Sequence, residues 1–217
     1  MRLLLTGSLK VLLLLFAALI PIVFLLFRLI DSAGLWMVVS DPIPKRLDVI
    51  YTYAGEGVRN YYSRVLFDRH PETLWIVGRW PMRRRYYQAL YNGVDSTRLW
   101  FMPTDSLNTH LEFLGLCGLL DSLAKLRPPG SPELEVGLVS GPYHMRRIFN
   151  DVLYCRPAGL AVRIHFLPVP FSDYQQTSQS YRSFWRSSHL CSLLQLELMK
   201  MAWYYLSYWA KHPLSCH

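Results

Sequence analysis

Hydrophobic residues follow two different patterns along this chain, and the first is a single long run near the N-terminus. Residues 11–27 include no charged or strongly polar side chain, and Lys10 and Arg28 flank them. At about 1.5 Å per residue the run covers roughly 26 Å, and apolar neighbours at both ends extend it to bilayer thickness. Pro21 is tolerated in such a helix as a local kink. The run predicts an uncleaved membrane-spanning helix within an anchor of residues 1–30.

A secretory signal peptide is the competing interpretation of this run, because Arg2 and Lys10 precede its leucine-rich part. The run is longer than the usual ~7–15 residues of a signal peptide, and no small-x-small cleavage motif follows Arg28. A lipoprotein fits less well still, because the first cysteine is Cys117. The span is therefore favoured, although counting charges on its two sides leaves the orientation open.

The second pattern begins after a proline-containing linker, residues 31–46, and fills one predicted domain, residues 47–217. Short apolar runs alternate with longer amphipathic stretches, which is typical of βα units around a mostly parallel sheet. The short runs predict five strands, at residues 47–54, 73–77, 98–102, 135–140 and 162–167. The longer stretches predict helices at residues 58–68, 82–91, 108–126 and 143–153, and an aromatic-rich C-terminal helix at about 184–210. The expected fold class is α/β.

Charge changes this picture by indicating the kind of partner. The formal net charge is +8. The predicted anchor carries three basic residues and no acid, so the remainder has a net charge of +5. A moderately basic domain suits anionic partners such as phosphates, lipid headgroups or acidic glycans. Nucleic acid is not expected, and the sequence indicates no particular cofactor.

The four cysteines, Cys117, Cys155, Cys191 and Cys216, form no CxxC pair and have no spacing typical of a zinc or iron–sulfur site. We therefore expect no metal site. Cys117 and Cys191 are expected to be buried thiols on helices, because free cysteine behaves as a small hydrophobe. A disulfide remains open.

The strongest candidate site follows the fourth predicted strand, at residues 140–147, SGPYHMRR. In an open parallel sheet, ligands bind where the carboxyl ends of strands meet the next helices. The strand ends at Ser140, and the glycine and proline after it suit a tight turn into a helix whose free N–H groups attract anions. Tyr143, His144 and Arg147 follow, and the last two share a helix face. The alternative is that His144 only caps or packs and the arginines are solvated.

Two further segments should reach the same edge of the sheet. Ser106, Asn108 and Thr109 open the long predicted helix, although such residues often serve only as caps. Gly55 and Arg59 belong to the segment that follows the first strand. The glycine spacing in this segment is too irregular for a dinucleotide-binding fingerprint. The arginine would nevertheless bring a guanidinium to the cleft.

Together these segments resemble the SanA, ElyC and YdcF family of bacterial envelope-associated proteins. The shared features are the arginine-containing first loop, the Ser-x-Asn-Thr helix start and the Tyr-His-Met-x-Arg turn, which is the most specific. The similarity runs from about Asp48 to the C-terminal helix, where Trp185, Glu197 and Lys200 fall in a family-like arrangement. The resemblance implies a Rossmann-like three-layer fold of about five strands on a single-pass bacterial inner-membrane protein. It also implies a periplasmic or extracytoplasmic domain that serves peptidoglycan or surface-polysaccharide biogenesis and barrier integrity.

One departure from the family pattern affects the expected chemistry. Members usually have a Gly-Gly pair and an acid after the second strand, whereas here Gly78 leads into a basic run with Arg83, Arg84 and Arg85, and no acid occurs before Asn92. The missing carboxylate would be a natural general base, so an enzymatic role is weakened and the cleft should be more cationic. Alternatively, the basic run is a solvated face or lies against anionic headgroups.

The leading hypothesis is thus a membrane-anchored protein that binds a phosphorylated or otherwise anionic small molecule or envelope precursor. The predicted ligand-binding residues are Gly55, Arg59, Ser106, Asn108, Thr109, Ser140, Tyr143, His144 and Arg147, and the candidate catalytic residues are His144 and Ser140. A hydrolase or transferase acting on a lipid-linked precursor is the first alternative. A non-catalytic scaffold, whose basic run and aromatic C-terminal helix contact membrane lipid, is the second. The oligomeric state stays open.

Overall fold

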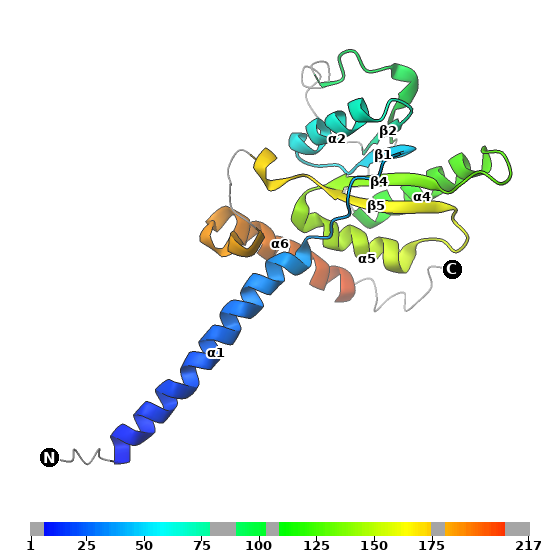
Figure 1. The fold of residues 1–217 in the computed structure, drawn as a ribbon. Helices are drawn as coiled ribbons and strands as arrows, with labels where there is room; N and C mark the ends of the chain where they lie inside the picture. The colour runs from blue at the N-terminus through cyan, green and yellow to red at the C-terminus, as the bar shows by residue number, and fades with distance from the viewer. Residues whose placement is uncertain (1–6, 79–89, 103–108, 175–180, 207–217) are drawn as a thin grey trace.

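A five-stranded, all-parallel sheet forms the centre of the molecule, as the computed structural model shows for residues 7–78, 90–102, 109–174 and 181–206 (Figure 1). Its strands are β1 Val49–Thr52, β2 Leu74–Val77, β3 Leu99–Phe101, β4 Leu134–Ser140 and β5 Val162–Pro168. They lie in the order β3-β2-β1-β4-β5. The chain therefore builds outward first on one side of β1 and then on the other. The predicted α/β class and parallel sheet are confirmed.

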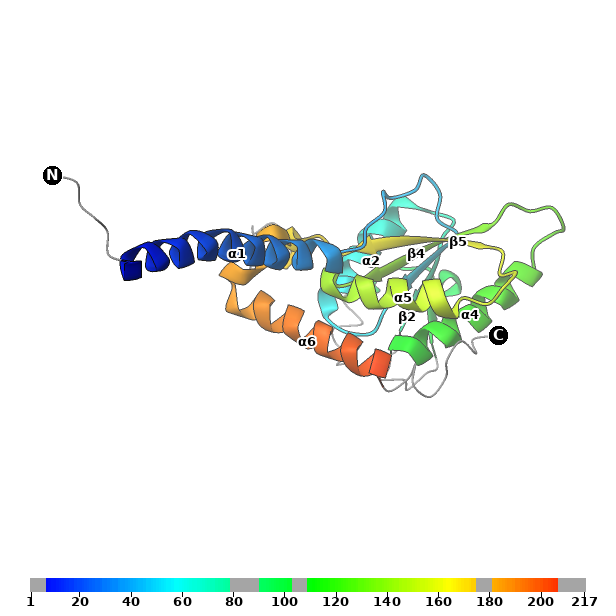
Figure 2. The same ribbon diagram turned by 90° about the horizontal axis from the view of Figure 1, so that it is seen from below.

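Helices cover both faces of this sheet. They are α2 Gly57–Arg69, α4 Thr109–Lys125, α5 Met145–Cys155 and α6 Ser188–Tyr204. Side chains of α2 pack on one face, and side chains of α4 and α5 pack on the other. This arrangement has three layers, consistent with a Rossmann-like fold. The C-terminal end of α6 lies beside α5 and the start of α4, where the Tyr204 hydroxyl contacts Asp151 and His110 (Figure 2).

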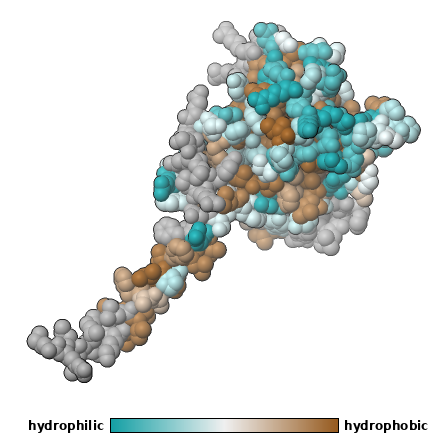
Figure 3. Space-filling model, viewed as in Figure 1, coloured by the Kyte–Doolittle hydropathy of each residue, from teal (hydrophilic) through white to brown (hydrophobic). Residues whose placement is uncertain are grey.

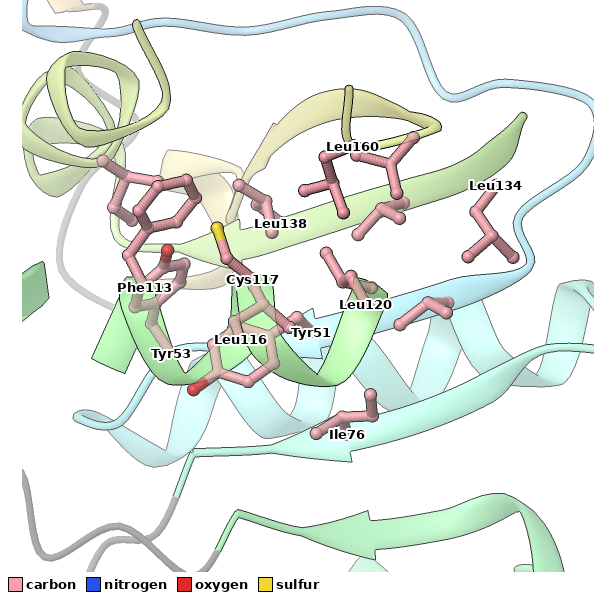
Figure 4. Close-up of a cluster of buried hydrophobic side chains, with 14 of the residues drawn as sticks. Tyr51, Tyr53, Ile76, Phe113, Leu116, Cys117, Leu120, Leu134, Leu138 and Leu160 are labelled. Carbon is pink, nitrogen blue, oxygen red and sulfur yellow. The ribbon is translucent and has the colours of Figure 1, made fainter. Parts of the chain in front are cut away.

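The central strand, β1, shows why the strands appear in the sequence as nearly continuous apolar runs. All four residues of β1 are buried. Val49 and Tyr51 face α4, whereas Ile50 faces α2, because successive side chains point to opposite faces of a sheet. On the α4 side, Phe113, Leu116 and Leu120 pack over the sheet (Figure 4). A strand covered on both faces needs apolar residues at every position.

A small polar group lies within the core on the α2 face. The Thr52 hydroxyl donates to Ser63 Oγ at 2.6 Å and accepts from the indole N–H of Trp75 at 2.9 Å. All three side chains are buried. Each polar group therefore has a partner, which burial requires.

Helix α1, Gly7–Met37, projects from the domain as a long rod (Figures 1 and 3). Its apolar side chains are exposed; Leu14, for example, is 70 % exposed. Among the described residues, no helix is both long enough and apolar enough to cross a membrane. The C-terminal end of α1 is fixed to the domain. Met37 is fully buried there, and the Arg146 guanidinium donates to the Trp36 carbonyl at 2.6 Å and stacks on its ring.

Several predicted boundaries need correction. The predicted helix at 82–91 lies almost entirely outside the described residues. The helix expected at 143–153 is a 3₁₀ turn, Pro142–His144, followed by α5, because Pro142 favours a tight first turn. The C-terminal helix begins later than expected, after the 3₁₀ segment Tyr181–Arg186, where the Ser187 hydroxyl accepts from the Leu190 N–H and caps α6.

The cysteine predictions are correct only in part. Cys117 is a buried thiol on α4, as expected, but Cys191 on α6 is only partly buried. Cys155 is also buried, at the end of α5. No disulfide joins these three described cysteines to one another, and Cys216 lies outside the described residues.

Candidate functional site

A cavity of about 810 Å³ lies beyond the carboxyl ends of β1 and β4, where the strand order reverses. This crevice is where open α/β sheets bind ligands. Its walls come from the start of α2, the turn after β4, the segment Phe171–Asp173 and the first turns of α6. The lining includes the charged or titratable residues Glu56, Arg59, His144, Asp173, His189 and Glu197, and the apolar residues Val58, Phe171, Leu190 and Leu193.

Arg59 lines this cavity and lies between two glycines, Gly55 and Gly141. Its Nη1 donates to the Ala54 carbonyl at 2.7 Å. A Cβ at Gly55, which has φ of +147°, would lie 2.5 Å from that Nη1, and a Cβ at Gly141 would lie 3.4 Å from Nη2. The Nε–H is buried and has no acceptor among the described residues. The guanidinium thus has a donor left for a ligand.

His144 contacts side chains from three helices. Its Nε2 lies 3.2 Å from Thr109 Oγ1, and its Nδ1 lies 2.7 Å from Arg147 Nη2 and 3.5 Å from Glu197 Oε2. The pKa of His144 is lowered to about 3, chiefly by burial and also by the charges of Arg147 and Arg59, while Glu197 opposes the shift. Arg147 Nη2 also lies 3.2 Å from Nε2, and Nδ1 faces both that donor and the Glu197 carboxylate, so these contacts fit either tautomer. With its lowered pKa, His144 is neutral at pH 7.

Glu197 of α6 holds this group of side chains together. Its carboxylate lies 3.2 Å from Arg147 Nη2 and accepts from Lys200 Nζ at 2.9 Å. Burial alone would raise the pKa of Glu197. A hydrogen bond with His144, the positive charge of Arg147 and a hydrogen bond from Lys200 outweigh it and hold the pKa at about 2. The charge of Arg147 is consequently balanced within the protein.

A second carboxylate, Glu112 in the first turn of α4, lies at the same edge of the sheet. It accepts from the Tyr51 hydroxyl at 2.8 Å and from the Ala54 N–H at 3.0 Å. Burial raises its pKa, although these hydrogen bonds and the nearby Arg59 and Arg147 oppose the shift. A Cβ at Gly78 would lie only 2.1 Å from Glu112 Oε1, so the end of β2 must be a glycine here. A carboxylate thus stands beside Gly78, although it comes from α4 and not from the loop after β2.

The structure brings several of the predicted site residues together. Arg59, Tyr143 and His144 line the cavity, Gly55 lies against Arg59, and Thr109 and Arg147 contact His144. Ser140 does not line it. That residue is fully buried, and its hydroxyl has no partner among the described residues. Ser106 and Asn108 lie outside the described residues.

Sequence reasoning missed Glu112 and gave Glu197 no role. One signal for Glu112 was available, since it lies three residues after Thr109 and so shares its helix face, amid otherwise apolar core positions. No comparable signal marks Phe171, Asp173 or Leu190, which reach the cavity only through the path of the chain after β5 and the placement of α6.

The charge of the described lining differs from the cationic cleft that the basic composition suggests. Three carboxylates, those of Glu56, Asp173 and Glu197, share the lining with one arginine, Arg59. The basic residues Arg83, Arg84 and Arg85 lie outside the described residues. Positive charge in the described lining is therefore local to Arg59.

No protein-family model, curated protein or solved structure matches the chain. The chemistry of the site must therefore be argued from its own geometry.

Thr109, His144 and Glu197 have the spatial order of a nucleophile, a base and an orienting acid. Two observations oppose that use. Arg147 Nη2, which can only donate, lies 2.7 Å from His144 Nδ1 and 3.2 Å from Nε2, so it competes for the ring lone pair that would have to accept the threonine proton. The lowered pKa of His144 also makes it a weak base. Binding, with Arg59 as the available donor, is the chemistry that the arrangement favours.

Proposed function

We propose that this chain is a membrane-anchored cell-envelope protein that binds a small molecule carrying one phosphate or other compact anionic group. The observation that carries the proposal is the buried Nε–H of Arg59, which has no acceptor among the described residues and belongs to a residue that lines the cavity. A buried donor without an acceptor is costly, and an anionic ligand would remove that cost. A guanidinium also matches a phosphate or carboxylate geometrically.

The rest of the lining supports a ligand whose body is much less charged than its head. Arg59 is the one arginine in the described lining, whereas Phe171, Leu190 and Leu193 supply an apolar wall. The carboxylates of Glu56 and Asp173 would repel a second anionic group nearby. The volume of about 810 Å³ is within the usual range for small-molecule sites. A monoanionic or phosphorylated molecule with a partly apolar body fits this description.

The proposed location of the protein at a membrane is supported by the exposed apolar surface of α1 and by the resemblance to envelope-associated proteins. Leu14, Phe16 and Phe24 are each more than half exposed. Removing one such side chain from water is worth about 1.5–3 kcal/mol, so a lipid environment would stabilise a helix that exposes many of them. The family resemblance supports an extracytoplasmic domain and a ligand from peptidoglycan or surface-polysaccharide biogenesis.

Calorimetric titration of the full-length protein with phenyl phosphate tests the binding proposal. Arg59→Gln should weaken binding by roughly ten- to a hundredfold, because a hydrogen bond to a charged group contributes about 1.5–3 kcal/mol. Arg69→Gln is the matched control, since Arg69 is an exposed arginine of the same helix. Phenol, which lacks the phosphate, should not distinguish wild type from Arg59→Gln. Equal affinity of phenyl phosphate for wild type and Arg59→Gln would refute the proposal.

Membrane attachment is tested separately by fractionating cells that express the full chain or a chain without residues 1–30. The full chain should sediment with membranes and need detergent for release, while the truncated chain should not. A C-terminal reporter that works only outside the cytoplasm should be active. Release of the full chain by salt or alkali alone would contradict the anchor.

A hydrolase or transferase acting on a lipid-linked precursor is the second candidate, favoured by the contacts of His144 with Thr109 and Glu197. In that case Arg147 would have to leave His144 Nδ1 when the substrate binds. Turnover of a phosphate or glycosyl ester that is abolished by both His144→Gln and Thr109→Val would support it. If the wild type binds the ester but does not turn it over, the enzymatic role is refuted and the binding role remains.

A further inference from the structure

A second polar cluster lies away from the cavity, where α4, α5 and α6 meet. It contains His110 of α4, Asp151 and Cys155 of α5, and Tyr204 of α6. His110 and Asp151 are at most 1 % exposed, and Cys155 is buried as well. The imidazole, the carboxylate and the thiol place one ligand atom each within 4.8 Å of the others. None of these residues belongs to the proposed anion site.

The side chains converge because of helix geometry. Asp151 and Cys155 are four residues apart on α5 and so lie on one face of that helix. His110 reaches them from the first turn of α4, and its Nδ1 lies 3.0 Å from Asp151 Oδ1. The Tyr204 hydroxyl closes the remaining side, 2.8 Å from both of those atoms.

These donors are the set that zinc prefers. Thiolate, imidazole and carboxylate are its usual protein ligands, with bond lengths of about 2.0–2.3 Å. Neighbouring nitrogen and oxygen ligands of a tetrahedral zinc ion therefore lie about 3.3 Å apart. The present His110–Asp151 separation of 3.0 Å needs to open only slightly to reach that value. One thiolate and one carboxylate would also balance the charge of a divalent ion, as a buried site requires.

An independent observation is the second carboxylate oxygen of Asp151. Asp151 Oδ2 is buried and has no hydrogen-bond partner among the described residues. A buried carboxylate oxygen without a partner is costly, and coordination to a cation would remove that cost.

We propose that His110, Asp151 and Cys155 bind a structural Zn²⁺ ion, with the Tyr204 hydroxyl on the fourth side. Binding converts the Cys155 thiol to a thiolate and releases its proton to solvent. The ion fastens α6 to α4 and α5. Because Glu197 precedes Tyr204 by seven residues, about two turns of the same helix, fixing Tyr204 also fixes the carboxylate that holds His144 and Arg147.

The test uses the full-length protein, stripped with a chelator, equilibrated with excess Zn²⁺ and desalted before metal analysis. Wild type should retain one zinc ion per chain and unfold at a higher temperature than the stripped form. Cys155→Ser and Asp151→Asn should each weaken zinc binding by at least roughly tenfold and lose that thermal shift. Cys191→Ser, which changes a partly buried thiol on α6, is the matched control and should behave as wild type.

A second measurement needs no variant and so does not depend on whether the variants fold. Co²⁺ added to stripped wild-type protein should give the near-ultraviolet absorption band of a cobalt–thiolate bond, and excess Zn²⁺ should abolish it. Wild type that retains no zinc, or a Cys155→Ser protein that retains a full equivalent, would overturn the proposal. The cluster would then be held by hydrogen bonds alone.

Discussion

Replacing Gly78 with alanine tests the placement of the buried Glu112 carboxylate. The added Cβ would lie 2.1 Å from Glu112 Oε1, 2.8 Å from the Ala54 nitrogen and 3.0 Å from the Thr52 oxygen. Because two of these atoms are backbone, the carboxylate has to move. It then loses its hydrogen bonds from the Tyr51 hydroxyl and the Ala54 N–H.

The magnitude follows from those two bonds. Leaving two buried donors without an acceptor costs about 2–5 kcal/mol in total, and the gain from replacing glycine by alanine in the unfolded chain offsets about 0.5–1 kcal/mol. We expect Gly78→Ala to lower the free energy of unfolding by about 1–4.5 kcal/mol. Gly118→Ala is the matched control. Its Cβ would meet nothing within 4 Å on the exposed side of α4, so it should stabilise the helix by about 0.5–1 kcal/mol.

Chemical denaturation of the full-length protein in detergent, followed by tryptophan fluorescence, measures both changes. A third variant distinguishes this cause from a general backbone strain. If Gly78→Ala acts by displacing Glu112, then adding Glu112→Gln to it should cost much less than Glu112→Gln costs alone. A Gly78→Ala protein as stable as wild type, or fully additive effects, would refute this account of the β2 end.

Three other predictions concern His144, the thiols and the polar core. Because an unfolded histidine binds its proton near pH 6.5 and folded His144 only near pH 3, the unfolded state holds more protons between these values, so stability should fall as pH falls. Between pH 6.5 and 4.5 the slope should reach at most about 1.4 kcal/mol per pH unit, and it should be smaller in His144→Gln; an unchanged slope would contradict the neutral histidine. Alkylation of the native protein followed by peptide mass spectrometry should modify Cys191 well before Cys117, because Cys117 is buried and burial raises its pKa to about 12; equal rates would contradict this. Thr52→Val should destabilise the fold by about 1–3 kcal/mol, since it leaves the Trp75 N–H without its acceptor, whereas an unchanged denaturation midpoint would count against that bond.

The sequence predicted the sheet well because parallel strands buried on both faces produce apolar runs that stand out. All five predicted strands overlap observed ones, and β4 differs by a single residue at its start. Helix boundaries were harder to predict where a single residue outside the periodic hydrophobic pattern determines where the helix begins. Pro142, for example, begins the 3₁₀ turn that precedes α5, and Ser187 separates a 3₁₀ segment from α6.

The residues of the candidate site could be predicted only where a local sequence pattern, such as the end of a strand, marks them. Arg59 and His144 follow strands directly, so the rule that ligands bind at the carboxyl ends of parallel strands located them. Glu197 and Asp173 come from segments after the last strand, and their positions depend on how α6 and the preceding turn pack, which has no sequence period. The His110, Asp151 and Cys155 cluster was invisible to a search for metal motifs, because its ligands come from two helices far apart in the sequence.

The most direct test of the binding claim is a crystal structure of the protein grown with dodecyl phosphate, which joins one phosphate to an apolar chain. We predict phosphate oxygens within hydrogen-bonding distance of Arg59 Nε, about 3 Å, and the alkyl chain against Leu190 and Leu193. Phosphate bound elsewhere, or a cavity that stays free of the ligand while Arg59 Nε contacts only protein, would contradict the account.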